Sequence, residues 1–171
     1  ERTPGDWGGI VILGRAKTNR TSEPTIEGGI GRPYGGTNDL DNSGVLKYVR
    51  IEYAGIAAMP NSEINALTLG GVGSGTIIEN VQTIYANDDA FEFFGGTVNA
   101  SYVSVVNAQD DSIDWTEGYT GTITNAYVKH GVDHDKGIEA DGYNTDFSNA
   151  AGFFSKPTIT NLTIIGNGSG T

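Results

Sequence analysis

The sequence predicts an all-β fold, a parallel β-helix with about 23 residues per turn that extends over residues 1–171 as one β-solenoid domain. Three observations support this prediction. Residues 73–142 repeat one unit three times, in the segments 73–96, 97–119 and 120–142. Within each unit, short runs alternate apolar and polar residues, which is typical of strands with one buried face. Glycine accounts for 26 of the 171 residues, which suits a chain that turns often.

Aligning the copies places residues of the same kind in columns. The apolar columns are Leu46, Ile78, Ala100, Ile123 and Ile159; Val49, Val81, Val103, Ala126 and Leu162; Ile51, Thr83, Val105, Val128 and Ile164; Leu67, Phe91, Ile113 and Ile138; and Leu69, Phe93, Trp115 and Ala140. A corner column contains Tyr48, Asn80, Tyr102, Asn125 and Asn161. Asparagine is favoured at such a corner because it tolerates the left-handed conformation and can hydrogen-bond to the asparagine of the next turn. Strands this short cannot bury their apolar face alone, so we expect the turns to stack in parallel about 4.8 Å apart.

In chain order, the first expected strand lies within residues 9–14, a β-branched run bounded by glycines. Residues 43–72 form a complete turn with an insertion, and residues 156–166 open a further turn. Where the strand pattern is interrupted we expect loop excursions, near residues 15–42, 56–64 and 143–155. The first is long for a compact domain, so we expect it to serve a function or to contact a partner.

Four segments, 5–14, 43–55, 88–99 and 137–141, resemble a known family. This family comprises the right-handed parallel β-helix repeat proteins of secreted and cell-surface bacterial type, including adhesin-like surface proteins. The resemblance implies a right-handed helix, in agreement with the handedness rule for parallel crossovers. It also implies a location outside the cell or on the bacterial cell surface, but no particular activity.

The composition excludes several classes of partner. Asp and Glu number 21 against 10 Lys and Arg, which gives a net charge of −11. Such a surface repels nucleic acid and anionic membranes but attracts divalent cations. No run of 18 apolar residues is present, so we expect no membrane insertion. The absence of Cys and the presence of only two His argue against zinc, copper and iron sites.

The strongest candidate site is acidic. Its carboxylates recur in the three copies as Asp88, Asp89 and Glu92, as Asp110, Asp111 and Asp114, and, with one inserted residue, as Asp133, Asp135 and Glu139. Stacking would place them on one flank, where like charges repel unless a cation screens them. We expect Ca²⁺ ligands among Asp88, Asp89, Asp110, Asp111, Asp133 and Asp135, and an outward-facing ligand flank of Glu92, Asp114 and Glu139. The alternative is a solvated acidic face whose aspartates cap turn amides.

Two other patterns are weaker. Residues 38–44 open like an EF-hand, but position twelve counted from Asp39 is Arg50 instead of Glu, which leaves an Asx-turn cluster or a loop Ca²⁺ site. Bases and acids also come together in one turn, which contains Lys129, His130, Asp133, His134, Asp135 and Lys136. A solvated charged turn is the commoner explanation of such a group, and catalysis is the alternative. We therefore predict no catalytic residue and no cofactor other than Ca²⁺, and a non-enzymatic role is favoured.

These features predict a structural or adhesive segment of an extracellular bacterial β-solenoid surface or filament protein, stabilised by Ca²⁺. The alternative is a β-helix that binds or cleaves a polysaccharide, as a lyase or hydrolase, along the acidic flank. No capping helix is visible at either end of the sequence, and an uncapped solenoid exposes its strand edges. We therefore expect the chain to be part of a longer chain or assembly, with neighbouring solenoid segments or subunits as partners at both ends.

Overall fold

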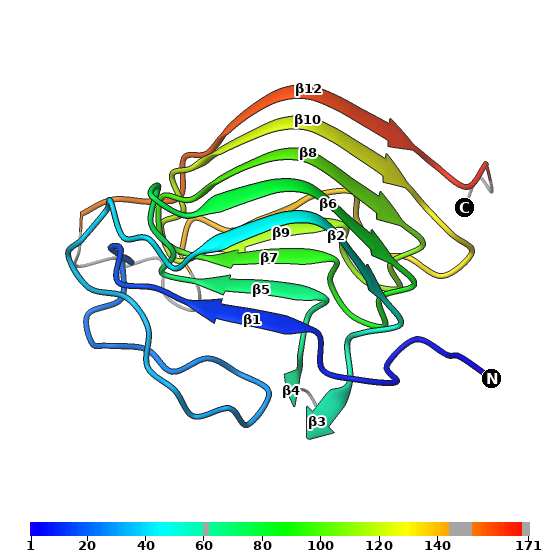
Figure 1. Ribbon diagram of the computed structural model, residues 1–171, viewed down its shortest axis with the longest axis horizontal. Coiled ribbons are helices and arrows are strands. Elements are labelled where there is room, and N and C mark those ends of the chain that lie inside the picture. Colours follow the sequence, from blue (N-terminus) through cyan, green and yellow to red (C-terminus); the bar gives the residue numbers. More distant parts are fainter. Residues whose placement is uncertain (60–61, 144–151, 169–171) are drawn as a thin grey trace.

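The computed structural model is a right-handed parallel β-helix, which confirms the predicted fold (Figure 1). It describes residues 1–59, 62–143 and 152–168. The short-strand sheet consists, in spatial order, of β1 (Ile10–Leu13), β5 (Leu67–Gly70), β7 (Phe91–Phe94), β9 (Ile113–Thr116) and β11 (Glu139–Ala140). The long-strand sheet consists of β2 (Val45–Glu52), β6 (Ile77–Ile84), β8 (Asn99–Val106), β10 (Thr122–Lys129) and β12 (Thr158–Ile165). All neighbouring strands in both sheets are parallel.

The strand register reproduces the predicted columns. Ile78, Ala100 and Ile123 lie opposite one another on successive turns, 22 and 23 residues apart along the chain. The first strand, β1, pairs with β5, so that Ile10 extends the column of Leu67. The repeat unit predicted from the sequence is therefore one turn of the helix.

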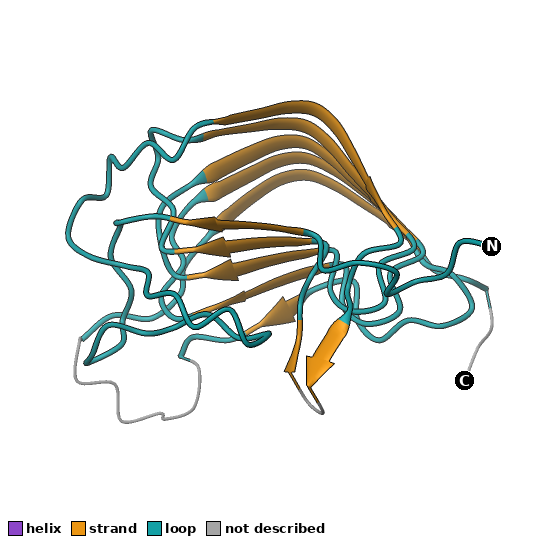
Figure 2. Cartoon of the chain, turned by 60° about the horizontal axis from the view of Figure 1, so that its bottom comes forward, coloured by secondary structure: helices purple, strands orange, loops and turns teal. Residues whose placement is uncertain are grey.

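The eight-residue strands bend in the middle (Figure 2). The bend falls on the predicted corner column, whose members Tyr48, Asn80, Tyr102, Asn125 and Asn161 have φ angles between 53° and 58°. The corner thus lies inside these strands, which continue to pair on both sides of it. Between the last two turns, Nδ2 of Asn161 donates to Oδ1 of Asn125 over 2.9 Å, which is the predicted asparagine contact.

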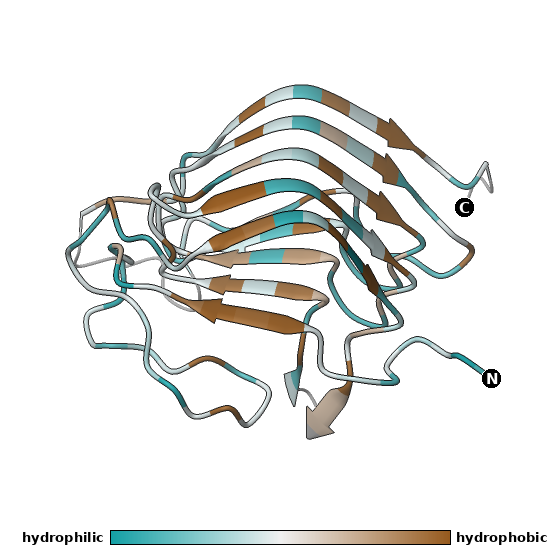
Figure 3. Ribbon diagram, viewed as in Figure 1, coloured by the Kyte–Doolittle hydropathy of each residue, from teal (hydrophilic) through white to brown (hydrophobic). Residues whose placement is uncertain are grey.

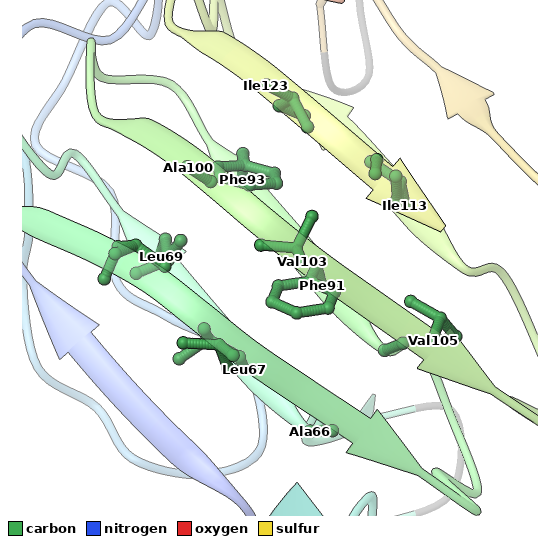
Figure 4. Packing of buried hydrophobic residues seen from close by; sticks show 14 of the residues in the cluster. Ala66, Leu67, Leu69, Phe91, Phe93, Ala100, Val103, Val105, Ile113 and Ile123 are labelled. Carbon is green, nitrogen blue, oxygen red and sulfur yellow. The ribbon is translucent and has the colours of Figure 1, made fainter. Parts of the chain in front are cut away.

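An apolar core fills the space between the two sheets. Buried apolar side chains of both sheets pack together there (Figure 4), and apolar residues recur along the strands of both sheets (Figure 3). Leu67, Phe91 and Phe93 of the short-strand sheet pack in the same cluster as Val81 and Val103 of the long-strand sheet. Burial of these side chains drives the stacking, because no single turn could remove them from water.

The predicted excursion over residues 15–42 covers part of the outer face of the short-strand sheet. Ile26 and Tyr34 pack there against Phe94, with Val11 and Leu13 of β1 at the edge of the cluster. The ring centroids of Tyr34 and Phe94 are 6.1 Å apart. One side of this sheet therefore faces the core, and the other is partly covered by the chain itself.

Of the other two excursions, one contains strands that were not predicted, and the other lies mostly outside the described residues. Residues 56–64 include an antiparallel hairpin of β3 (Ala57–Met59) and β4 (Ser62–Glu63), which the sequence did not predict. Most of the excursion near 143–155 lies outside the described residues. Among the described residues, no helix is long and apolar enough to cross a membrane.

Candidate metal centre

Three columns of polar side chains run across the outer side of the short-strand sheet, and we call them together the acidic ladder. The strand column consists of Thr68, Glu92, Asp114 and Glu139, which lie opposite one another on β5, β7, β9 and β11. The turn column, three residues before it, consists of Asn65, Asp89, Asp111 and Lys136. The acidic corner column, distinct from the Tyr/Asn corner within the long strands, consists of Asp88, Asp110 and Asp135. Parallel stacking explains the ladder, because each turn returns the same repeat position to the same place.

Part of the ladder is buried, in contrast to the solvated acidic face considered from the sequence. Glu92 and Asp114 point outward from their strands but are each only 8% exposed, and Asp111 is 1% exposed. The first excursion reaches this region, and the backbone N–H of Gly28 donates to Oγ of Ser62 on the hairpin over 3.0 Å. This cover could not be predicted from the sequence, because the excursion and the ladder are far apart along the chain.

Three overlapping groups of carboxylates form within the ladder. In each group, the three carboxylate oxygens lie within 4.8 Å of one another. The buried triad is Asp89, Glu92 and Asp114; the first corner triad is Asp88, Asp89 and Asp110; and the second corner triad is Asp110, Asp111 and Asp135. Five of the six predicted Ca²⁺ ligands are therefore brought together, along with Glu92 and Asp114 of the predicted flank.

Asp133 is the predicted ligand that these groups leave out. It is exposed and lines a separate surface hollow with Asn107 and Gln109. Asp133 precedes Asp135 by two residues, and the residue that occupies the place of Asp89 and Asp111 on the third turn is Lys136. The third copy thus presents an acid followed by a lysine where the first two present two aspartates.

The buried triad holds three carboxyl groups in an environment that opposes their ionisation. Burial raises the pKa of Asp89 to about 9, and the nearby Asp114 and Asp88 add to this effect. Burial raises the pKa of Asp114 to about 7 and holds the pKa of Glu92 well above its usual range. In the described part of the chain, no Lys, Arg or His side chain forms an ion pair with these three residues. Ionised carboxylates buried together are unfavourable, so they need protons or a cation.

Oxygen atoms without hydrogen-bond partners surround the triad. Nδ2 of Asn65 donates to Glu92, which leaves Oδ1 of this buried amide without a partner among the described residues. The same holds for Oγ1 of Thr68, next to Glu92 in the strand column, and for Oδ1 of Asp114. Buried polar atoms without partners are uncommon and point to a missing water or ion.

Glu27 of the excursion brings a further carboxyl group within hydrogen-bonding reach of Glu92 and Asn65. Sequence reasoning missed Glu27, Asn65 and Thr68 as site residues. For Asn65 and Thr68 a signal existed, because residues 65–71 match the acidic segment that begins at Asp89. For Glu27 there was none, because its segment lies outside the repeat.

The expected capping of turn amides also occurs. Oδ1 of Asp89 accepts a hydrogen bond from the backbone N–H of Asp111 over 3.0 Å. Oδ1 of Asp111 accepts one from the backbone N–H of Lys136 over 2.6 Å. Each aspartate thus uses one oxygen to link two turns, and a carboxylate has a second oxygen that can bind a cation.

The basic residues considered as a catalytic group divide between two separate contacts. The rings of His130 and His134 pack edge to face with centroids 4.2 Å apart, and burial followed by His134 lowers the pKa of His130. The Nζ of Lys136 contacts Asp135 and lies 3.2 Å from Oε1 of Glu139 and 3.6 Å from Oδ2 of Asp111. Its hydrogen bond to Asp135 raises the pKa of Lys136, so the ammonium stays protonated.

The loop at residues 38–44 forms the Asx-turn cluster. Oδ1 of Asn42 accepts from the backbone N–H of Gly44, and Oδ2 of Asp41 accepts from Oγ of Ser43. Asp39 pairs with Lys17 over 2.9 Å. These carboxylates therefore have local partners.

Comparison with known protein families gave one match over the whole chain. The family is described as a pectate-lyase-like beta helix domain, and its match covers residues 1–171. Neither a curated protein nor a solved structure matched the chain.

Proposed function

The chain belongs to the family of pectate-lyase-like β-helix domains, and from the geometry of its acidic ladder we propose that it is a Ca²⁺-stabilised structural segment of an extracellular bacterial β-solenoid protein. The observation that carries this proposal is the buried triad. Asp89, Glu92 and Asp114 place three carboxylates within 4.8 Å, with no cationic side chain of the described residues paired to them.

Calcium is the cation that best fits these ligands. The groups around the triad are carboxylates, the amide of Asn65 and the hydroxyl of Thr68, all of them oxygen donors. Ca²⁺ accepts six to eight oxygens in flexible geometry, whereas softer metals prefer nitrogen and sulfur. An affinity in the ~10⁻⁴–10⁻³ M range, as in extracellular calcium-binding modules, would suit a location outside the cell.

A metal ion bound to the buried triad would stabilise the folded chain. Its ligands come from β7, from β9 and from the turns before them, and Glu27 adds the excursion. A cation held there would therefore link successive turns of the helix to the chain that covers them. A ligand that binds only the folded state stabilises it by about 2.7 kcal/mol at a concentration of 100 times its Kd.

The second candidate is binding or cleavage of a polysaccharide, which rests on the family's likeness to pectate lyases. A lyase needs a base that can accept a proton at working pH. Lys136, the basic residue at the ladder, is held protonated by its carboxylate partners. The described residues therefore favour the structural role over catalysis at this site.

Partners at the two ends belong to the same proposal. The outermost long strands, β2 and β12, each have one edge without a neighbouring strand among the described residues. Ile164 and Ile165 on β12 are 42% and 44% exposed. Exposed apolar strand edges favour the addition of further strands, so we place neighbouring solenoid segments or subunits there.

Calcium titration followed by thermal unfolding and calorimetry tests the proposal. We expect ~1–10 mM Ca²⁺ to raise the Tm by several degrees, since 1 kcal/mol corresponds to roughly 2–4 °C in a domain of this size. Glu92→Gln should abolish this rise without lowering the Tm in chelator, because the amide is isosteric with the protonated carboxyl group that burial favours here and cannot lose a proton to bind the metal.

The matched control is Glu79→Gln. Glu79 lies on β6 of the other sheet, where it pairs with Lys47 over 2.7 Å, so this variant should keep the full response to Ca²⁺. Tb³⁺ luminescence locates the metal, because Trp115 directly follows Asp114. Trp115→Phe should remove the sensitised emission and Trp7→Phe should not. If calorimetry finds no bound Ca²⁺ and the Tm does not change, the proposal is wrong.

A further inference from the structure

The two sheets of the helix are offset from each other by half a turn. Along the chain, β2, β6, β8 and β10 are each followed by the short strand of the same turn, which is β5, β7, β9 and β11 in that order. Within the described residues, β12 has no short strand to complete its turn, and β1, which precedes β2, has no long strand (Figure 1). One end of the stack therefore presents an unmatched long strand, and the other end presents an unmatched short strand.

These two unmatched strands are able to complete each other. β12 pairs with β10 and β1 pairs with β5, so each has a second edge without a neighbouring strand among the described residues. If β12 of one copy of the chain lies along the free edge of β2 in a second copy, the free edge of β11 in the first copy meets the free edge of β1 in the second. The junction is then a whole turn, whose long strand comes from one copy and whose short strand comes from the other.

The apolar side chains of this junction match those of an existing turn. Three aliphatic residues of β2 and two of β5 fill the interior of the first complete turn, namely Leu46, Val49, Ile51, Leu67 and Leu69. Three aliphatic residues of β12 and two of β1 would fill the junction, namely Ile159, Leu162, Ile164, Ile10 and Ile12. Because the number and the size of the side chains agree, the core can continue through the junction at the same packing density.

Inward-facing side chains at the two ends are less buried than their equivalents inside the stack. At one end, Leu46 is only partly buried, whereas Ile78 opposite it on the next turn is 2% exposed. At the other end, Ile164 is 42% exposed, whereas Val128 opposite it is fully buried. The junction would cover this apolar surface, and its removal from water favours association.

The backbones of β2 and β12 are also compatible. Both strands have eight residues and bend at a residue in the left-handed conformation, with φ angles of 55° at Tyr48 and 58° at Asn161. Continuing the register of the long-strand sheet would place Thr160 of one copy beside Lys47 of the next. β12 contains no charged residue, so no like charges would lie opposite each other along the two strands.

From this complementarity we propose that a second copy of this chain docks head to tail, with its β2 and β1 against β12 and β11 of the first copy. The inference rests on the proposed function, in which solenoid segments or subunits lie at both ends of the chain, and it names that partner. Each copy keeps one end of each kind, so the addition can continue and builds a filament. Five turns per copy, about 4.8 Å apart, give a repeat of about 24 Å along the axis.

Sedimentation of the chain at increasing concentration tests the proposal. We expect the wild type to form oligomers whose mass grows with concentration. Ile164→Lys places an ammonium inside the junction turn and should keep the chain monomeric, while the exposure of Ile164 in the single copy lets the variant fold. Ile165→Lys is the matched control, because Ile165 is 44% exposed and lies opposite the exposed Lys129 on the outer side. It should assemble as the wild type does.

Paired cysteines test the register of the junction, because the sequence contains no native Cys. Lys47→Cys combined with Thr160→Cys places two thiols opposite each other across the junction, so mild oxidation should give a ladder of disulfide-linked oligomers. Within one copy these positions are four turns apart, about 19 Å, which is too far for a disulfide. Lys47→Cys combined with Thr163→Cys is out of register by about 10 Å and should stay largely unlinked. This test does not depend on the folding of Ile164→Lys.

The outcomes separate this proposal from the proposed function. A wild type that is monomeric at every concentration, or a folded Ile164→Lys that assembles as the wild type does, would overturn the head-to-tail junction. Equal ladders from the two cysteine pairs would also overturn it, because they would show contact without the expected register. If Ca²⁺ raises the Tm of a chain that stays monomeric, the junction is wrong and the calcium-stabilised role stands. If the chain assembles but does not respond to Ca²⁺, the calcium role is wrong and the junction stands.

Discussion

At the scale of single residues, the helix depends on a conformation that most amino acids avoid. Nine non-glycine residues of the described chain have φ angles between 53° and 58°, and they comprise four asparagines, four tyrosines and Glu117. The left-handed conformation costs roughly 1–2 kcal/mol for an ordinary residue and less for asparagine. Tyrosine has no such advantage, but contacts between turns offset the cost at one corner, where the rings of Tyr53 and Tyr85 stack 5.3 Å apart.

Substitutions at Asn125 distinguish the contribution of its backbone conformation to stability from the contribution of its side-chain hydrogen bond. Asn125 has a φ of 58° and accepts a hydrogen bond from Asn161. Asn125→Ala loses both advantages, so we expect the free energy of unfolding to fall by about 1–2 kcal/mol. Asn125→Gly keeps the conformational freedom and should lose less. Urea unfolding measures both, and an alanine variant at least as stable as the glycine variant would contradict this explanation.

At the scale of secondary-structure elements, the excursion over residues 15–42 determines how much of the ladder meets water. Tyr34 anchors it through its ring against Phe94 and through its hydroxyl, which donates to Oε2 of Glu117 over 2.7 Å. Glu117 is 2% exposed, and Arg20 lies 3.6 Å from its other oxygen. The anchor therefore combines apolar packing with a buried hydrogen bond.

Removal of the Tyr34 hydroxyl tests this anchor. Tyr34→Phe keeps the ring but takes a donor from a buried carboxylate, so we expect a loss of about 1–3 kcal/mol in the free energy of unfolding. Tyr102→Phe is the control, because Tyr102 is 58% exposed and its hydroxyl forms no hydrogen bond within the described residues. Equal stability of the two variants in chemical denaturation would show that the Tyr34–Glu117 bond does not hold the excursion in place.

The strands of the repeat could be predicted from the sequence, but the segment that covers the outer side of the short-strand sheet could not. The columns of Ile78 and Phe91 followed from the alternating pattern, because stacking turns repeat that pattern at a fixed period. The carboxylates of Glu92 and Asp114 point outward from their strands, as predicted, but they are buried, whereas one of the two interpretations had them solvated. Their burial depends on residues outside the repeat, such as Glu27, whose position no periodicity determines. The inserted residue before Lys136 likewise shifts the third copy, so that Asp135 follows Asp110 in the stack and Asp133 lies outside the three carboxylate groups.

At the scale of the whole molecule, the ladder concentrates part of the net charge of −11 on one side of one sheet. Burial raises the pKa of Asp88, Asp111 and Asp114 to about 7 and that of Asp89 to about 9. Unfolded aspartates lose their protons near pH 4. Between these values the folded chain holds more protons than the unfolded chain, so its stability must fall as the pH rises.

This linkage predicts that protons and calcium each stabilise the folded chain and compete for the same carboxylates. In chelator, we expect the Tm to fall by on the order of 5–10 °C between about pH 5 and about pH 8.5, since several shifted carboxyl groups each contribute to the loss. Calcium binds the deprotonated carboxylates, so the rise in Tm that it causes should be small at the acidic limit and largest at the basic one. Thermal unfolding at constant ionic strength, with and without Ca²⁺, measures both trends. A Tm independent of pH in chelator would contradict the burial of the charges. A calcium effect of equal size at both limits would contradict the exchange of protons for metal, because the same oxygens cannot hold a proton and a metal ion at once.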